Sequence, residues 1–185
     1  RNFNLKSRKN NDSTKLIFEI FMDNPVSKYL SAQYDSMVNW VNGNIDPLTD
    51  EELQMELSPG KNHGIWILGH LIVSDDDFSL YMGKGDLLFP EYYEIFGAKS
   101  KIQPAESYAP ATLLRKQWKE VVEKNKKIYA ELTDEELKQP HAKIEDFEND
   151  FFKTKENIAK FWQLHQMYHA GQLSVLVSRA GKSAY

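Results

Sequence analysis

The 185-residue sequence contains no cysteine. This absence excludes disulfide bonds, thiolate metal sites and cysteine nucleophiles, and it fits a cytoplasmic protein. Long apolar runs are also missing. None approaches the roughly 18 residues that a membrane helix needs, and no apolar stretch of signal-peptide type lies near the start. We therefore expect no association with a membrane.

Clustered positive charge is scarce. The formal net charge is -4 and the sequence pI is about 5.8. Nucleic-acid binding would require a basic face, so we expect no nucleic-acid partner. The most basic stretch, residues 1–15, has five basic residues and one acid. We expect an N-terminal arm over residues 1–24 with a possible short helix at 14–22, and a binding patch on the surface is the alternative.

The alternation of apolar and polar residues that marks strands is absent, so we expect little or no sheet. Apolar residues at helical spacing instead predict four long helices, over about 25–42, 62–82, 110–131 and 155–180. Asn24 before Pro25 is typical of an N-cap, and Gly43 of a helix end. The helix at 62–82 is apolar on more than one face, which indicates a central position or a subunit interface.

The hexamer LTDEEL occurs twice, at 48–53 and 132–137. In each copy the threonine and the second glutamate have the spacing of a capping box, and the two leucines have that of a hydrophobic staple. Each copy is therefore predicted to begin a short helical turn after a long helix. The repeat is either a common cap that recurs by chance or the mark of two helical hairpins descended from one unit.

These features predict an all-α fold, a four-helix bundle that occupies residues 25–185 as one domain. Residues 83–109 are rich in glycine and proline and form a long crossover between helices two and three. A long link permits those two helices to run parallel. The sequence does not decide whether this segment is a lid over a site or only a connection.

The segment FWQLHQMYHAGQL, residues 161–173, places His165 and His169 four residues apart. On a helix both imidazoles lie on one face, close enough to bind one metal ion. His70, on the helix at 62–82, is the natural third ligand. Three imidazoles leave positions open, as in catalytic sites, and suit Zn, Ni, Fe or Cu. The alternative is that each histidine is a core residue with a hydrogen-bond partner.

Two polar residues are candidates for supporting such a site. Asp77 follows His70 by seven residues and is the acid placed to orient a ligand or to hold a water molecule. Gln172 shares the helical face of His165 and His169. Position 166 is Gln rather than Glu, so the helix lacks the general base of the HExxH metalloproteases.

The remaining polar candidates have plainer interpretations. His63 is expected near the first turn of its helix, in a surface or capping role. His141 follows a proline in a loop and has no special role assigned. The acidic run at 75–77 is more typical of a solvated face than of a set of metal ligands.

Three parts of the sequence together resemble the DinB superfamily of four-helix bundles, often described as metal-dependent hydrolases. The first is residues 47–78, in which a Pro-Gly-Lys turn precedes a helix that bears one histidine. The second is residues 161–181, in which HxxxH is followed by Gly-Gln-Leu. The third is the pair of LTDEEL caps. The resemblance implies an up-down-down-up bundle, a divalent metal that is most often Zn or Ni, and frequent homodimers. Position by position, it assigns the metal-ligand role to His70, His165 and His169.

Some members of that family are S-transferases that use low-molecular-weight thiols such as mycothiol, bacillithiol or glutathione. The first hypothesis is therefore an enzyme in which the metal activates a thiol cosubstrate for S-transfer, or water for hydrolysis. Transfer is slightly favoured because no strong general base is evident in the sequence. The second is a non-catalytic metal-binding or stress-related interaction protein with a structural metal. The third is a bundle without metal.

Overall fold

The computed structural model describes residues 24–146 and 150–183. The predicted arm, with its possible helix at 14–22, lies outside these residues except for Asn24. Within the described ranges the regular structure is helical, and the extended pairings are two isolated bridges, Glu56 with His63 and Pro140 with Thr154. The predicted all-α class is confirmed.

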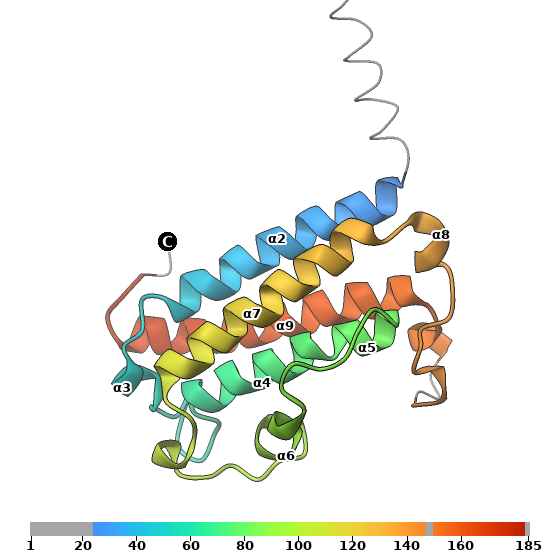
Figure 1. The fold of residues 1–185 in the computed structure, drawn as a ribbon. Coiled ribbons are helices and arrows are strands. Elements are labelled where there is room, and N and C mark those ends of the chain that lie inside the picture. The colour runs from blue at the N-terminus through green and yellow to red at the C-terminus, as the bar shows by residue number, and fades with distance from the viewer. Residues whose placement is uncertain (1–23, 147–149, 184–185) are drawn as a thin grey trace, which may run out of the picture.

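Four long helices form the bundle: α2 (Pro25–Ile45), α4 (Gly64–Asp76), α7 (Ala111–Glu131) and α9 (Lys155–Arg179). α2 and α4 each pack against both α7 and α9. In Figure 1, α4 and α7 run in one direction while α2 and α9 run in the other. Each hairpin is therefore antiparallel, and the two hairpins are joined through two parallel helices.

Shorter elements occupy the connections between the long helices. They are α3 (Asp50–Leu53), α5 (Phe78–Met82), α6 (Tyr93–Phe96), α8 (Asp134–Leu137) and 3-10 turns at Pro90–Tyr92, Ala105–Ser107, Ile144–Asp146 and Asp150–Lys153. The helix predicted at 62–82 is thus divided at Asp77 into α4 and α5. None of the helices in the described ranges has the length and apolarity required to cross a bilayer.

The core is formed by the apolar faces of all four long helices, and α4 is its centre. All thirteen residues of α4 are buried within the single chain. Its apolar character on every side therefore follows from a central position, which was one of the two alternatives that the sequence left open.

Both predicted capping boxes are present. The Thr49 hydroxyl accepts a hydrogen bond from the backbone amide of Glu52. In return, the Glu52 carboxylate accepts one from the backbone amide of Thr49. Thr133 and Glu136 make the same pair of bonds at the start of α8. The repeated hexamer thus begins the same short helix after α2 and after α7.

The predicted N-cap position of Asn24, with Pro25 at the first helical position, is confirmed, but two details of the helix ends differ from the prediction. α2 continues past Gly43 to Ile45, and the Asn24 side chain does not cap it. The carboxylate of Asp134, from α8, instead accepts hydrogen bonds from the amides of Val26 and Ser27. The Asn24 side chain accepts one from the Asp134 amide at 2.9 Å. The cap comes from residues more than a hundred positions away, where a local pattern could not reveal it.

The acidic run at 75–77 is not the solvated face that the sequence suggested. Asp75 and Asp76 are only 2% and 1% exposed. The Asp76 carboxylate accepts hydrogen bonds from the amides of Leu88 and Phe89, at 2.8 and 2.9 Å, and forms an ion pair with Lys124 of α7. Asp76 therefore fixes the beginning of the crossover against the bundle.

Candidate metal centre

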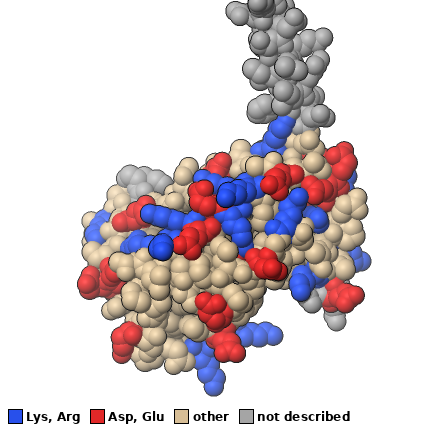
Figure 2. Space-filling view, viewed as in Figure 1, with Lys and Arg blue, Asp and Glu red and all other residues tan. Residues whose placement is uncertain are grey.

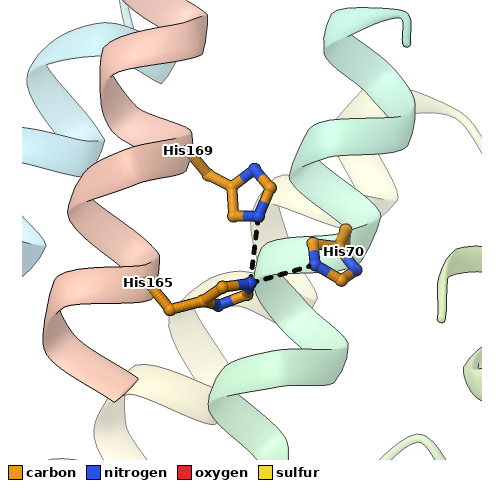
Figure 3. A group of neighbouring side chains, drawn as sticks. All are labelled: His70, His165 and His169. Atoms are coloured by element: carbon orange, nitrogen blue, oxygen red, sulfur yellow. Dashed lines mark hydrogen bonds between the residues drawn. The ribbon is translucent and has the colours of Figure 1, made fainter. Parts of the chain in front are cut away.

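Three histidines from two helices converge inside the bundle. His70 lies on α4, and His165 and His169 lie one turn apart on α9, facing His70 (Figure 3). The Nε2 atom of His165 lies 3.4 Å from that of His70 and 3.1 Å from that of His169. The structure thus brings together the three residues that the sequence singled out as candidate ligands.

The spacing of these nitrogens fits a shared metal ion. An ion about 2.0–2.1 Å from each of two imidazole nitrogens, with an angle of about 90–110° between the bonds, holds those nitrogens about 2.9–3.4 Å apart. Both observed distances fall within this interval. All three ligand atoms lie within 4.8 Å of one another, so the arrangement brings the three rings close enough to surround one ion.

The hydrogen bonds on the outer side of two rings determine where their protons lie. His70 Nδ1 donates to the backbone carbonyl of Phe96 at 2.7 Å, and His169 Nδ1 donates to Oε1 of Gln172, also at 2.7 Å. A neutral imidazole carries one proton. The Nε2 atoms of both rings therefore present lone pairs to the centre, as metal ligation requires.

Burial keeps these rings neutral. It lowers the pKa of His70, that of His165 to about 4, and that of His169 to about 3, with the neighbouring histidines adding to the shifts of the last two. His165 supplies at most one proton to the two lone pairs that face it. The centre therefore has more acceptors than donors, and a cation satisfies all three nitrogens at once.

His70 is held in place by parts of the structure that the sequence did not reveal. The Phe96 carbonyl belongs to α6, in the crossover, and the indole of Trp66 stacks on the imidazole with ring centres 4.8 Å apart. A Cβ on Gly69 would lie 2.3 Å from the Phe96 ring. The glycine thus lets α6 approach α4 beside His70. A glycine before a histidine in an apolar helix was the signal available in the sequence.

Gln172 lies where the sequence placed it, beside the candidate ligands His165 and His169 on α9. Its Oε1 accepts the proton of His169, and its Nε2 donates to the hydroxyl of Tyr168 at 3.2 Å. The amide is thus held from both sides, which fixes the orientation of the His169 ring.

A pocket of about 230 Å³ opens beside His70 and His165. Asp77 lines the same pocket, and its Oδ1 has no hydrogen-bond partner among the described residues. Burial, and then the charge of Asp76, raises the pKa of Asp77 to about 7. Asp77 therefore faces the pocket, whereas Gln172 contacts a histidine.

The crossover supplies one wall of this pocket. Tyr93, Gly97 and Ala98 line it opposite the aromatic rings of Phe161 and Trp162 from α9. The segment at 83–109 is therefore part of the candidate site and more than a connection between two helices. Its sequence gave no indication of which residues face the histidines, because those positions depend on the packing of α6 against α4.

The other two histidines lie away from the centre, and both are buried. His63 occupies the N-cap position of α4 but makes no capping hydrogen bond there, and its Nε2 lies 3.9 Å from Glu56. The predicted surface or capping role is therefore wrong. His141 is in a loop, as expected, where its Nδ1 accepts from the Lys143 amide and its ring contacts Tyr81.

Comparison with known proteins supports the same family that the sequence resembles. The family model of the DinB superfamily matches residues 34–173. No curated protein matches the chain. A crystal structure described as a conserved protein from Enterococcus faecalis has a similar fold, with a TM-score of 0.64 and 15% identity, and the alignment covers 84% of this chain and 98% of that one. At this identity the likeness concerns the fold alone.

Proposed function

The chain belongs to the DinB superfamily, and from this premise we propose that it is a metal-dependent enzyme. His70, His165 and His169 hold a divalent ion, Zn or Ni, that activates a thiol cosubstrate for S-transfer or water for hydrolysis. The observation that carries the proposal is the convergence of three Nε2 atoms, two of which have their outer nitrogens bonded to fixed acceptors.

A bound ion of this kind supplies Lewis-acid chemistry, because it lowers the pKa of a thiol or water that it contacts. The protein's own contribution is to keep the histidines neutral and oriented. Burial holds their pKa values below the usual range, while Phe96 and Gln172 fix two of the rings. Little reorganisation is then required when the ion binds.

The pocket favours catalysis over a purely structural metal. A structural site is closed by four protein ligands, whereas three ligands leave a position for substrate. Here His70 and His165 border a pocket of about 230 Å³ whose walls are largely aromatic and apolar. Such a volume suits a small molecule, and the apolar walls exclude bulk water from the reacting atoms.

Asp77 is the group in this pocket that takes up or returns a proton. Its carboxyl group is mostly buried, and its pKa of about 7 lets it exchange a proton near neutral pH. The apparent lack of a general base was a reason to favour transfer over hydrolysis. With Asp77 in the pocket that reason disappears, and thiol and water are equally compatible with the site.

Elemental analysis of tag-free protein tests the metal. Wild type is expected to contain close to one equivalent of Zn or Ni, and the H165A/H169A variant is expected to contain none. The H63A variant, which removes a histidine outside the centre, should retain the metal. Wild type that carries no metal and does not take up added Zn or Ni overturns the proposal.

Activity is tested on the metal-loaded protein with small electrophiles and each of several low-molecular-weight thiols, and with ester or amide substrates in water. The D77N variant should keep its metal content and lose most of kcat with little change in KM, because it binds but cannot exchange the proton. Stoichiometric metal without turnover of any pair, together with a large loss of thermal stability on chelation, would favour the structural metal instead.

A further inference from the structure

The pocket beside His70 and His165 differs in charge from the outer face of α7. Figure 2 shows lysines and acids along the face on which α7 lies, and a hollow of about 660 Å³ along α7 is lined by five lysines and three glutamates. Among the described residues that line the pocket of about 230 Å³, by contrast, none is a lysine or an arginine, and the acid is Asp77. This pocket therefore has no side-chain cation to pair with a carboxylate or phosphate group of a substrate.

One wall of the pocket is built from aromatic rings that are held in place. The indole Nε1 of Trp162 donates to the backbone carbonyl of Ser74 at 2.6 Å, and the indole packs against Tyr81 with ring centres 4.8 Å apart. The ring of Phe161 contacts that of Trp162, with 5.7 Å between centres, and makes an angle of 22° with the His165 imidazole. The wall thus presents ordered rings, which interact favourably with a further aromatic ring.

The opposite wall comes from the crossover and leaves space for a flat group. Tyr93 adds an aromatic ring that is 40% exposed, and its neighbours in this wall, Gly97 and Ala98, are the two smallest residue types. An apolar cavity of about 150 Å³ holds a benzene ring. The pocket, at about 230 Å³, therefore has room for one six-membered ring and a short substituent.

The polar side chains of the pocket offer little to a negatively charged group. The Ser74 hydroxyl donates to the backbone carbonyl of His70 at 2.5 Å, and the Trp162 N–H donates to that of Ser74. Both donors are therefore occupied, and the Asp77 carboxylate repels an anion. A buried charge without a partner is strongly unfavourable, so the pocket disfavours substrates whose carboxylate or phosphate groups would lie inside it.

From these observations we infer that the substrate of this site carries an uncharged aromatic ring. The ring lies between the crossover and the rings of Phe161 and Trp162, and its reactive substituent, a thiol or a carbonyl group, is directed toward the histidine centre. A positive charge on the ring would be repelled by the ion proposed for that centre. The inference rests on the proposed function for the reacting end, whereas binding of the ring depends on the pocket alone. Glutathione, which carries carboxylate groups, should be a poor cosubstrate.

Binding of the ring is tested by ligand-observed NMR on the full chain, both Zn-loaded and metal-free, with four matched probes. The uncharged aromatic probe is para-cresol, and para-methylcyclohexanol is its saturated counterpart. The anionic probe is para-hydroxybenzenesulfonate, whose sulfonate is a weak metal ligand, and the cationic probe is para-hydroxybenzylamine. Wild type should bind para-cresol about two- to tenfold more tightly than the saturated probe. It should bind para-cresol at least about tenfold more tightly than either charged probe.

Two variants test whether the ring occupies this pocket. A98L enlarges an exposed alanine in the crossover wall and should weaken binding of para-cresol at least about tenfold, because the leucine fills the space of the ring. A32L makes the same change at an exposed alanine of α2 and is the matched control. F161L keeps most of the bulk but removes the aromatic ring, and should reduce the preference for para-cresol over the saturated probe about two- to threefold.

The inference is overturned if wild type does not bind para-cresol, if it binds the saturated probe or a charged probe as tightly, or if A98L binds para-cresol as wild type does. Failure of the metal proposal has a different signature. Protein that takes up no Zn but binds the probes in the expected order supports the aromatic pocket and overturns the metal. Stoichiometric Zn without a preference for para-cresol does the reverse.

Discussion

Two polar centres lie within the bundle, and α4 contributes to both. In the histidine centre, His70, His165 and His169 direct acceptor nitrogens at one another. In the second centre, the carboxylate of Asp75 accepts a hydrogen bond from the Tyr34 hydroxyl at 2.5 Å, and its backbone carbonyl accepts one from the Asn125 amide. The protein thus supplies hydrogen-bond donors to the Asp75 centre but does not supply enough of them to the histidine centre.

The difference distinguishes two reasons for placing polar side chains in a core. A buried polar group that has its hydrogen-bond partner is a structural element of the core. A buried group of acceptors without donors is unfavourable until a cation occupies it. Burial alone therefore does not distinguish the candidate metal centre, because Asp75 is more completely buried than His165. The balance of donors and acceptors does.

The largest expected effect separates the centres by their response to metal. Adding Zn to metal-free wild type at about a thousandfold excess over its dissociation constant should raise the free energy of unfolding by about 4 kcal/mol. The H165A/H169A variant should show no such increase, whereas D75N should respond as wild type does. Urea denaturation with and without Zn measures the effect. An equal response in all three proteins would place the metal elsewhere.

The next effect concerns pH. Burial raises the pKa of Asp75 to about 6 in the folded protein, against 3.8 when unfolded. The folded state then binds more protons between these values, so the contribution of Asp75 to stability falls as pH rises from about 4 to 6. The total change is about 3 kcal/mol. The titratable and charged groups that act on Asp75 are Tyr34, Tyr129 and Lys124, and burial raises the pKa of both tyrosines above their usual range.

The matched variant for this effect is D75N, which stays neutral at every pH. In metal-free protein, the difference in unfolding free energy between D75N and wild type should grow in favour of D75N by about 3 kcal/mol from pH 4 to pH 7. The histidines contribute with the opposite sign, because their pKa values are lowered, but they are common to both proteins. A constant difference across the range would mean that Asp75 is not shifted.

A smaller effect is expected for the donor of the second centre. Y34F removes the hydroxyl that donates to Asp75 and leaves the ring that stacks on Tyr129. The loss of a hydrogen bond to a buried carboxylate should cost about 2 kcal/mol of unfolding free energy at pH 7. Metal affinity should be unchanged, which isothermal titration with Zn would establish. A marked fall in affinity would mean that the two centres are coupled.

The smallest effect is expected for Gln172, which accepts a hydrogen bond from the candidate ligand His169. Q172A leaves all three histidines in place but removes the acceptor for His169 Nδ1. Metal affinity should fall at least about tenfold, with little change in the stability of the metal-free protein. Q172E retains the acceptor and should retain the affinity. If Q172A binds Zn as tightly as wild type does, the outer hydrogen bond has no role in ligation.

Local patterns predicted much of this molecule. Helical spacing located the four long helices, and the LTDEEL spacing predicted both capping boxes, because a capping box involves residues three apart. The spacing of His165 and His169 likewise placed them on one face of α9. His70 could be proposed as their partner only because its helix was expected to face theirs.

What the sequence did not predict depends on contacts between distant segments. The Phe96 carbonyl orients His70 only because α6 folds back onto α4 at Gly69. Asp76 is buried because the amides of Leu88 and Phe89 and the amine of Lys124 reach it. No periodicity in the run of aspartates records these partners, so the run was interpreted as solvated.

The packing of α2 along α9 has a consequence for synthesis on the ribosome. α2 ends at Ile45 and α9 begins at Lys155, so about 110 residues are added between the two helices. At a rate of synthesis of about 5 to 20 residues per second, roughly 6 to 22 s pass between the completion of α2 and the start of α9. During that time the apolar face of α2 lacks one of its main packing partners and stays exposed on the nascent chain, and the bundle closes only after α9 has been made.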